Sequence, residues 1–280
     1  MLHWLLEPLS YEFMRTAIAT GILIGILCPV VGCYLIVQRM ALLGDVIAHA
    51  ILPGLAIANY FGIDILWGAF SFGMFSTFVI AWIRSQSRVK VDAAMALTFA
   101  SFFALGVTLL NLLRSRLDLH EILFGDILSV SMNDVWRTLV IGLVILFTIK
   151  LCYKEFLFYT FDRTGAEAIG LPIRAINLGL MAIITLTLII GMKIVGVILV
   201  VSLMVGPAIT AYLLVKELHW MMIVGAGLGV LASVTGMYVS YHLNLPSGPA
   251  IALVIFALFL LALFFSPNQG ILTRPRQQKE

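Results

Sequence analysis

Residues Thr16–Val37 read TAIATGILIGILCPVVGCYLIV, a run without a charged side chain. About 20 apolar helical residues cross the hydrocarbon core of a bilayer, and a helix satisfies its own backbone hydrogen bonds there. This run is therefore predicted to be a transmembrane helix. Similar runs follow at about 41–61, 65–83, 93–113, 135–152, 176–192, 196–214, 221–241 and 250–265. The predicted fold class is all-α, a polytopic membrane protein with about nine transmembrane helices.

The composition of the chain supports the same class. Hydrophobic residues make up 62% of the 280 residues, charged residues make up 11%, and the mean hydropathy is +1.09. A soluble domain carries about 45–50% apolar and about 25% charged residues, so this chain lacks the polar surface of a soluble globule. We expect a single transmembrane domain over 1–280. The region 1–14 lacks a basic segment and is not predicted to be a cleaved secretory signal.

Charge and cysteine content exclude some other classes. The net charge is +3, and the basic residues gather between apolar runs. This pattern favours a topology signal over a nucleic-acid surface. Cys28, Cys33 and Cys152 show no CxxC spacing, so neither a disulfide framework nor a zinc knuckle is predicted.

The distribution of Lys and Arg predicts the orientation. With nine spans, the basic segments at 84–90, 154–174, 216 and 274–279 all fall on one side, which the positive-inside rule makes cytoplasmic. The segments 62–64 and 242–248, which lack Lys and Arg, fall on the other side, as does the N-terminus. The exceptions are the outward Arg114 and Arg116, whose charge is diluted by Asp118, Glu121, Asp126 and Asp134.

Residues 43–54, LGDVIAHAILPG, carry the most informative chemistry. Asp45 and His49 are four residues apart, which places them on one face of a helix, within an apolar span. Asp45 is the only acidic residue predicted well inside a span, where a charge costs at least about 2.5–3.5 kcal/mol. A carboxylate with an imidazole suits a divalent transition metal. Pro53 and Gly54 are expected to break or kink the helix just beyond the pair.

Two ligands are too few for a stable metal site. Two copies of the chain on a symmetry axis would provide two carboxylates and two imidazoles, enough to hold an ion transiently. Two other interpretations remain open from the residues alone. The pair is a buried Asp–His brace that serves packing, or Asp45 lies near the cytoplasmic interface, close to Arg39, and is simply hydrated.

A second segment, residues 161–172, reads FDRTGAEAIGLP and is predicted cytoplasmic. It is expected to form a short helix bounded by Gly165 and Gly170, with Pro172 as a stop. Such a helix suits docking of a partner, although an ordinary interfacial helix explains the pattern equally well.

Several small-residue patterns are interpreted as packing. They comprise the stretch 206–211, GPAITA, and the small-xxx-small pairs Gly21/Gly25 and Gly225/Gly229. His120 and Glu121, beside Asp118 and Asp126, could concentrate cations at the outer side, or simply belong to a solvated loop.

Motifs for catalysis and nucleotide binding are absent from the sequence. It holds no HExxH, no GxSxG and no GxxxxGK[ST] phosphate loop. Neither an intramembrane protease nor ATP binding through a phosphate loop is therefore predicted, and the chain is not expected to be an enzyme.

The segment 32–58, GCYLIVQRMALLGDVIAHAILPGLAIA, resembles the permeases of the manganese, zinc and iron ABC importers. The resemblance continues, in order, through LTFASFFALG at 97–106, ILFGDIL at 122–128, FD at 161–162, AIGLP at 168–172 and GPAITAY at 206–212. It covers nearly the whole chain, and the cyanobacterial-type manganese permeases look most similar. One departure is Gly206, where some relatives carry a residue such as threonine.

The resemblance implies an ABC importer permease of the metal/vitamin B12 type in a bacterial plasma membrane. It implies a homodimer, two copies of a separate cytoplasmic ATPase, and an extracytoplasmic metal-binding protein. The implied metal-pathway residues are Asp45 and His49, and the region 153–172 becomes a cytoplasmic coupling loop. Within that loop, the implied ATPase-coupling residues are Gly165, Ala166, Glu167, Ala168, Ile169 and Gly170.

The resemblance implies no permanently bound cofactor. The transported ion would be Mn²⁺, with Zn²⁺ or Fe²⁺ as alternatives, because the permeases for these metals share the Asp–His pair. A stand-alone secondary cation transporter is the main competing function. A membrane enzyme or structural subunit is a further alternative, against which the missing catalytic motifs argue.

Overall fold

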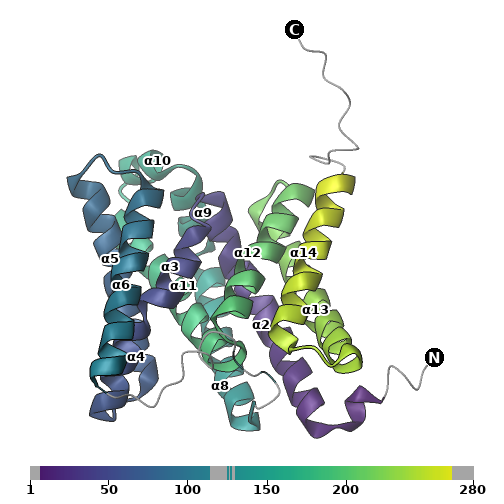
Figure 1. Ribbon diagram of the computed structural model, residues 1–280. Helices are drawn as coiled ribbons and strands as arrows, with labels where there is room; N and C mark the ends of the chain where they lie inside the picture. The colour runs from purple at the N-terminus through teal and green to yellow at the C-terminus, as the bar shows by residue number, and fades with distance from the viewer. Residues whose placement is uncertain (1–6, 114–124, 126, 128–129, 267–280) are drawn as a thin grey trace.

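The computed structural model describes residues 7–113, 125, 127 and 130–266, and every regular element among them is helical (Figure 1). The elements are η1 (Pro8–Ser10), α2 (Glu12–Val37), α3 (Leu42–Ala50), α4 (Leu52–Phe61), α5 (Ile65–Gln86), α6 (Val91–Leu112), α8 (Met132–Leu151), α9 (Tyr153–Phe161), α10 (Arg163–Ala168), α11 (Ile173–Val195), α12 (Val197–Leu214), α13 (Leu218–Leu243) and α14 (Ser247–Phe265). The residues Asp118, His120, Glu121 and Asp126, interpreted above either as a cation-attracting group or as a solvated loop, lie outside the described part, as do Arg114 and Arg116.

The prediction of about nine spans is confirmed, since the described part of the chain holds eight or nine candidates. In the described part of the chain, eight segments are long and apolar enough to cross a membrane, with α3 and α4 counted as one. Helices α8 and α9, bent by 68° where they join, make a ninth candidate span if the pair is counted as one. The bend has no Pro or Gly at Cys152, where the two helices join.

The predicted interruption near Pro53 is also found, at Ile51 between α3 and α4. Proline has no N–H, so Pro53 cannot donate the helical hydrogen bond that the carbonyl of His49, four residues earlier, would otherwise accept. The break therefore comes two residues after His49, at Ile51, and ends the short helix that carries His49.

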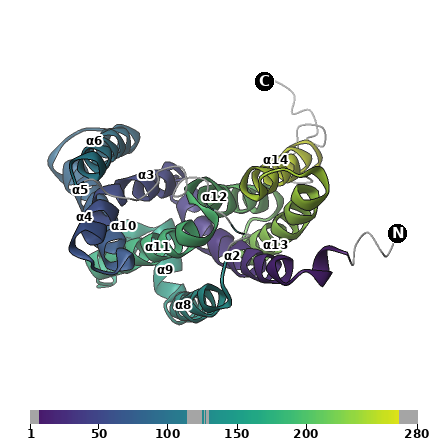
Figure 2. The same ribbon diagram turned by 60° about the horizontal axis from the view of Figure 1, so that its bottom comes forward.

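Helices α2, α11 and α12 lie at the centre of the bundle, between two groups (Figures 1 and 2). On one side, α4, α5 and α6 pack together with α3. On the other side, α13 packs on α2 and α12, and α14 packs on α12 and α13. Helix α11 joins the first group to the other central helices, because it contacts α3 and α5 as well as α2 and α12.

The α2–α13 contact depends on the predicted small-residue pairs. A Cβ on Gly25 would lie only 2.8 Å from the carbonyl oxygen of Gly229, and one on Gly21 would lie 3.3 Å from Cβ of Ser233. Glycine thus lets the two backbones touch, which is how helices associate where the hydrophobic effect is weak. The interpretation of these pairs as packing residues is confirmed.

The chain alternates between two ends of the bundle as the positive-inside pattern predicts. The α5–α6 connection, α10 and the exit from α14 lie at one end, the top of Figure 1, whereas the α4–α5 and α13–α14 connections lie at the other. Lys193, in the last turn of α11, is an exception to the pattern, because it is a basic residue at the lower end. Its Nζ lies 3.5 Å from the carboxylate of Asp134.

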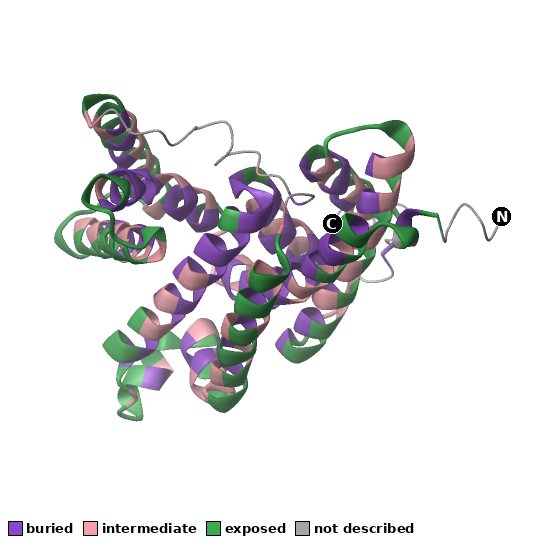
Figure 3. Cartoon of the chain, turned by 90° about the horizontal axis from the view of Figure 1, so that it is seen from below, coloured by how far each residue is buried: buried purple, intermediate pink, exposed green. Residues whose placement is uncertain are grey.

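The outer helices expose large apolar side chains, which suits contact with lipid or with another membrane chain. Trp67, Phe147 and Leu253 are each about two-thirds exposed. Figure 3 shows the buried residues gathered in the central helices and the exposed residues on the outer surfaces.

Candidate metal site and coupling helix

Asp45 lies in the first turn of α3 and His49 in its last turn. The predicted common face is confirmed by a contact between the two side chains: Nδ1 of His49 lies 3.4 Å from Oδ1 of Asp45. The axial separation of the two residues along the helix is about 6 Å, at 1.5 Å per residue.

The hydrogen bonding of His49 decides which ring nitrogen is available to a ligand. Nδ1 lies 2.9 Å from the main-chain carbonyl oxygen of Asp45. A carbonyl only accepts, so Nδ1 of the neutral ring donates its proton and Nε2 carries the lone pair. A metal-binding histidine is commonly held in this way, with one nitrogen fixed by the protein and the other presented to the ion.

Two aromatic rings from α6 hold the imidazole in place. The ring centroids of Phe99 and Phe103 lie 4.9 and 5.6 Å from that of His49, and each phenyl ring forms a T-shaped contact with the imidazole. The two phenyl rings are parallel to each other, with centroids 6.0 Å apart. Their contribution to the site was not predicted, because the contact joins two different spans.

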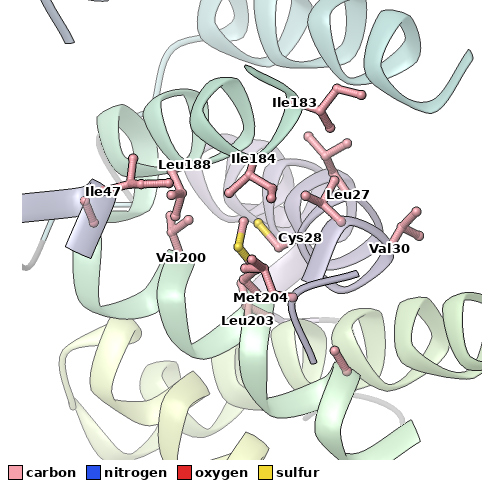
Figure 4. Packing of buried hydrophobic residues seen from close by; sticks show 14 of the residues in the cluster. Leu27, Cys28, Val30, Ile47, Ile183, Ile184, Leu188, Val200, Leu203 and Met204 are labelled. Carbon is pink, nitrogen blue, oxygen red and sulfur yellow. The ribbon is translucent and has the colours of Figure 1, made fainter. Parts of the chain in front are cut away.

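The opposite face of α3 is anchored in the core. Ile47 is fully buried, in one cluster with Leu188 of α11 and Val200 of α12 (Figure 4). This anchoring fixes the rotation of α3 about its axis, so Asp45 and His49 are held on the face that is turned away from the core.

The two polar side chains differ in exposure. The side chain of Asp45 is 47% exposed and that of His49 is 16% exposed. A fully buried Asp–His brace would hide its carboxylate, so the half-exposed Asp45 favours the ligand interpretation or the hydrated-interface interpretation over the brace.

The single chain does not complete a metal site among its described residues. Over that part of the chain, no group of three or more His, Cys, Asp and Glu side chains lies close enough together to hold a metal ion. Asp45 and His49 thus supply two ligand types, and any further ligand has to come from elsewhere.

The predicted cytoplasmic helix is present as α10, but it begins at Arg163 and not at Gly165. The reason is the capping of its first turn, because Oδ1 of Asp162 accepts a hydrogen bond of 2.8 Å from the backbone N–H of Gly165. Its end is as expected, with Gly170 at φ +82°. The region expected to be a loop from 153 also contains a further helix, α9.

The exposed surface of α10 is small but partly apolar. Ala166 is fully buried and Gly165 is partly buried, whereas Glu167, Ala168 and Gly170 are exposed. Ile169 directly after the helix is 67% exposed. A short exposed helix with an apolar tip has the chemistry of a protein-docking element.

Helix α11 connects α10 to the Asp45–His49 site. It contacts α10 at one end, and along its length it contacts α3. The contacts of α11 thus form a continuous packed path from α10 to the helix that carries the two candidate ligands.

Comparison with known proteins identifies the family. The model of the ABC 3 transport family matches residues 10–266. The chain is 42% identical over 269 residues to the manganese transport system membrane protein MntC of Halalkalibacterium halodurans, covering 96% of this chain and 92% of that protein. It is 37% identical over 272 residues to the manganese transport system membrane protein MntB of Synechocystis sp., covering 97% and 89%.

A solved structure shares the fold. PsaBC from Streptococcus pneumoniae in complex with Fab aligns with a TM-score of 0.87 and 36% sequence identity, covering 96% of this chain and 97% of that chain. The family match and the shared fold both extend over nearly the whole chain. The chain thus belongs to the ABC 3 transport family, as a multi-pass permease of the bacterial plasma membrane.

Proposed function

We propose that this chain is the membrane-spanning subunit of an ATP-driven importer that moves Mn²⁺ into the cytoplasm. Permeases of ABC importers work with a separate ATPase subunit and a substrate-binding protein. The choice of manganese rests on the relatives, which are named manganese transport proteins. The carboxylate and imidazole do not choose among Mn²⁺, Zn²⁺ and Fe²⁺.

The observation that carries the proposal is the half-exposed carboxylate of Asp45 beside His49, inside a candidate span. A charge in such a place faces a water-filled path or a bundle interior in most transporters. Nε2 of His49 offers a lone pair on the same helix. Two copies of the chain, meeting at α3, would provide two carboxylates and two imidazoles, the ligand set that one chain lacks.

Transport would then follow from the connection between α10 and α3. The substrate-binding protein delivers Mn²⁺ at the outer side, and the ligands of both copies hold it transiently. Two ATPase copies dock on the coupling residues 165–170, one on each permease. ATP binding and hydrolysis displace α10, and α11 transmits this displacement to α3, so that the ligand set separates and the ion is released inward.

The test measures cellular manganese, zinc and iron by elemental analysis. Cells that produce the chain with its ATPase are compared with cells that lack the chain, cells that lack the ATPase, and cells with Asp45→Asn. The matched control is Asp92→Asn, which also removes an exposed carboxylate from the first turn of a span.

The proposal predicts that manganese alone rises with the chain and its ATPase, and returns to the background level with Asp45→Asn but not with Asp92→Asn. A rise in zinc or iron instead would reassign the substrate within the family. Uptake that persists without the ATPase would favour a stand-alone secondary transporter. If the cellular content of none of the three metals changes with the chain, the metal assignment is wrong and Asp45 and His49 are a structural brace.

A further inference from the structure

A polar cavity of about 370 Å³ lies beside α10, at the end of the bundle that carries the basic loops. Five elements surround it: the region after α2, the last turn of α5, then α9, α10 and α11. Its lining includes two arginines, Arg84 of α5 and Arg163 of α10, far apart in the sequence. The cavity belongs neither to the Asp45–His49 site nor to the exposed tip of α10.

The charge of this cavity is positive and is not offset by its own lining. No carboxylate is among the described residues that line it. Neither Arg84 nor Arg163 forms an ion pair within the described part of the chain, although the guanidinium of Arg163 lies over the ring of Tyr159, 5.9 Å from its centroid. Two cations that share a cavity without an acid attract an anion.

The neutral groups add hydrogen-bond donors. The hydroxyl of Tyr159 donates to Oδ1 of Asn177 at 2.8 Å, so the amide N–H groups of Asn177 remain as donors. Nε2 of Gln38 donates to Oγ1 of Thr160 at 3.2 Å, which leaves the hydroxyl proton of Thr160 as a donor. These bonds also restrain four of the nine residues that line the cavity, so these donors are arranged before a ligand arrives.

The position along α5 indicates where the anion comes from. Arg84 lies two residues before the helix ends at Gln86, at the end of a span that is largely exposed on its outer face. Trp82, in the same turn, is 57% exposed. An exposed Trp followed by Arg is typical of the level of the lipid head groups, and basic pockets between spans on the cytoplasmic side bind acidic head groups.

We propose that this cavity binds the phosphate group of an acidic phospholipid, such as phosphatidylglycerol, between α5 and the coupling helix. A zwitterionic lipid fits less well, because its ammonium group would be brought near two guanidinium groups. The volume is within the range of about 300–1,000 Å³ that is usual for ligand pockets. A lipid held by Arg163 would tie α10 to α5 and stabilise the position of the coupling helix.

The test uses native mass spectrometry of the purified full-length permease. The protein is equilibrated with equal amounts of phosphatidylglycerol and phosphatidylcholine, and the retained lipid is counted. Wild type is compared with Arg84→Gln/Arg163→Gln and with the charge-preserving Arg84→Lys/Arg163→Lys. Arg88→Gln is the matched control, because Arg88 is exposed at the same end and does not line the cavity. A parallel arm replaces the lipid with inorganic phosphate.

The proposal predicts that wild type retains phosphatidylglycerol in preference to phosphatidylcholine. The amount of retained phosphatidylglycerol is expected to be at least about tenfold lower in the double Gln variant, since each charge-assisted contact is strong. We expect the double Lys variant to retain most of the lipid, because both positive charges remain; this result would show that the protein folds with both arginines replaced. We expect Arg88→Gln to retain as much lipid as wild type. Equal retention by wild type and the double Gln variant would overturn the proposal. So would arginine-dependent binding of inorganic phosphate without retention of phosphatidylglycerol. Neither result depends on metal transport, so the proposed function is tested separately.

Discussion

The ring of His49 lies edge-on to the ring of Phe99, with centroids 4.9 Å apart and planes inclined by 71°. Phe99 belongs to α6 and His49 to α3, so this contact joins two spans at the candidate metal site. Together with the hydrogen bond from Nδ1 to the carbonyl of Asp45, it leaves the imidazole little freedom to rotate.

Phe99→Leu is therefore expected to weaken metal capture without unfolding the protein. Loss of an edge-to-face ring contact costs about 0.5–1.5 kcal/mol, which corresponds to about a two- to tenfold change in an equilibrium constant. We expect the half-saturation concentration for Mn²⁺ uptake to rise by this factor. The control is Phe102→Leu, because the ring of Phe102 contacts Phe72 and Phe75 and not His49. Equal effects of the two substitutions would argue against positioning of His49 by Phe99.

A shared ligand set makes a prediction about mixed dimers. Wild-type and His49→Gln chains are produced together with different affinity tags, and dimers with one copy of each are isolated by purification on both tags. If both copies hold one ion, Mn²⁺ flux through the mixed dimer with its ATPase falls at least about tenfold, the usual scale for loss of a group at a metal site. Retention of about half of the wild-type flux would instead indicate that each chain has an independent path.

The α2–α13 crossing predicts opposite effects of the same substitution at two glycines of α13. Gly229→Ala places a methyl group against the backbone of Gly25 and against Pro29, and is expected to destabilise the protein by about 1–3 kcal/mol. Gly227→Ala meets no atom within 4 Å and is expected to be neutral or to stabilise by up to about 1 kcal/mol. Thermal unfolding of the purified protein measures both, and equal midpoints would contradict the close helix contact.

The spans were predictable from sequence because each one is a local run of apolar residues. In lipid, the backbone of such a run satisfies its own hydrogen bonds by forming a helix. The break before Pro53 was predictable for the same reason, since the missing N–H of proline acts within a single turn. The pair Asp45 and His49 was predictable because a spacing of four residues places two side chains on the same face of a helix.

Features that depend on contacts between spans could not be predicted in this way. No spacing rule brings Phe99 to His49, or Arg84 to Arg163, because each pair is joined by the packing of different helices. The 68° bend at Cys152 lacks a Pro or Gly to mark it, so α9 was expected to belong to a loop. The second pair of metal ligands would lie in another copy of the chain, which no single-chain pattern describes.

The coupling role proposed for α10 rests on its exposed tip, and Ile169 is the residue that tests it. A few anchor residues carry most of the binding free energy at a protein interface, and Ile169 is the large apolar side chain at this tip, 67% exposed. Ile169→Glu is therefore expected to lower co-purification of the ATPase at least about tenfold. Thermal stability of the isolated permease should not change, because the side chain makes little contact within its own chain. Ile63→Glu is the matched control, since Ile63 is 53% exposed at the opposite end of the bundle. If both substitutions leave the ATPase bound, docking does not depend on this tip. If both release it, the effect is a general loss of the permease fold, which the unfolding midpoints would reveal.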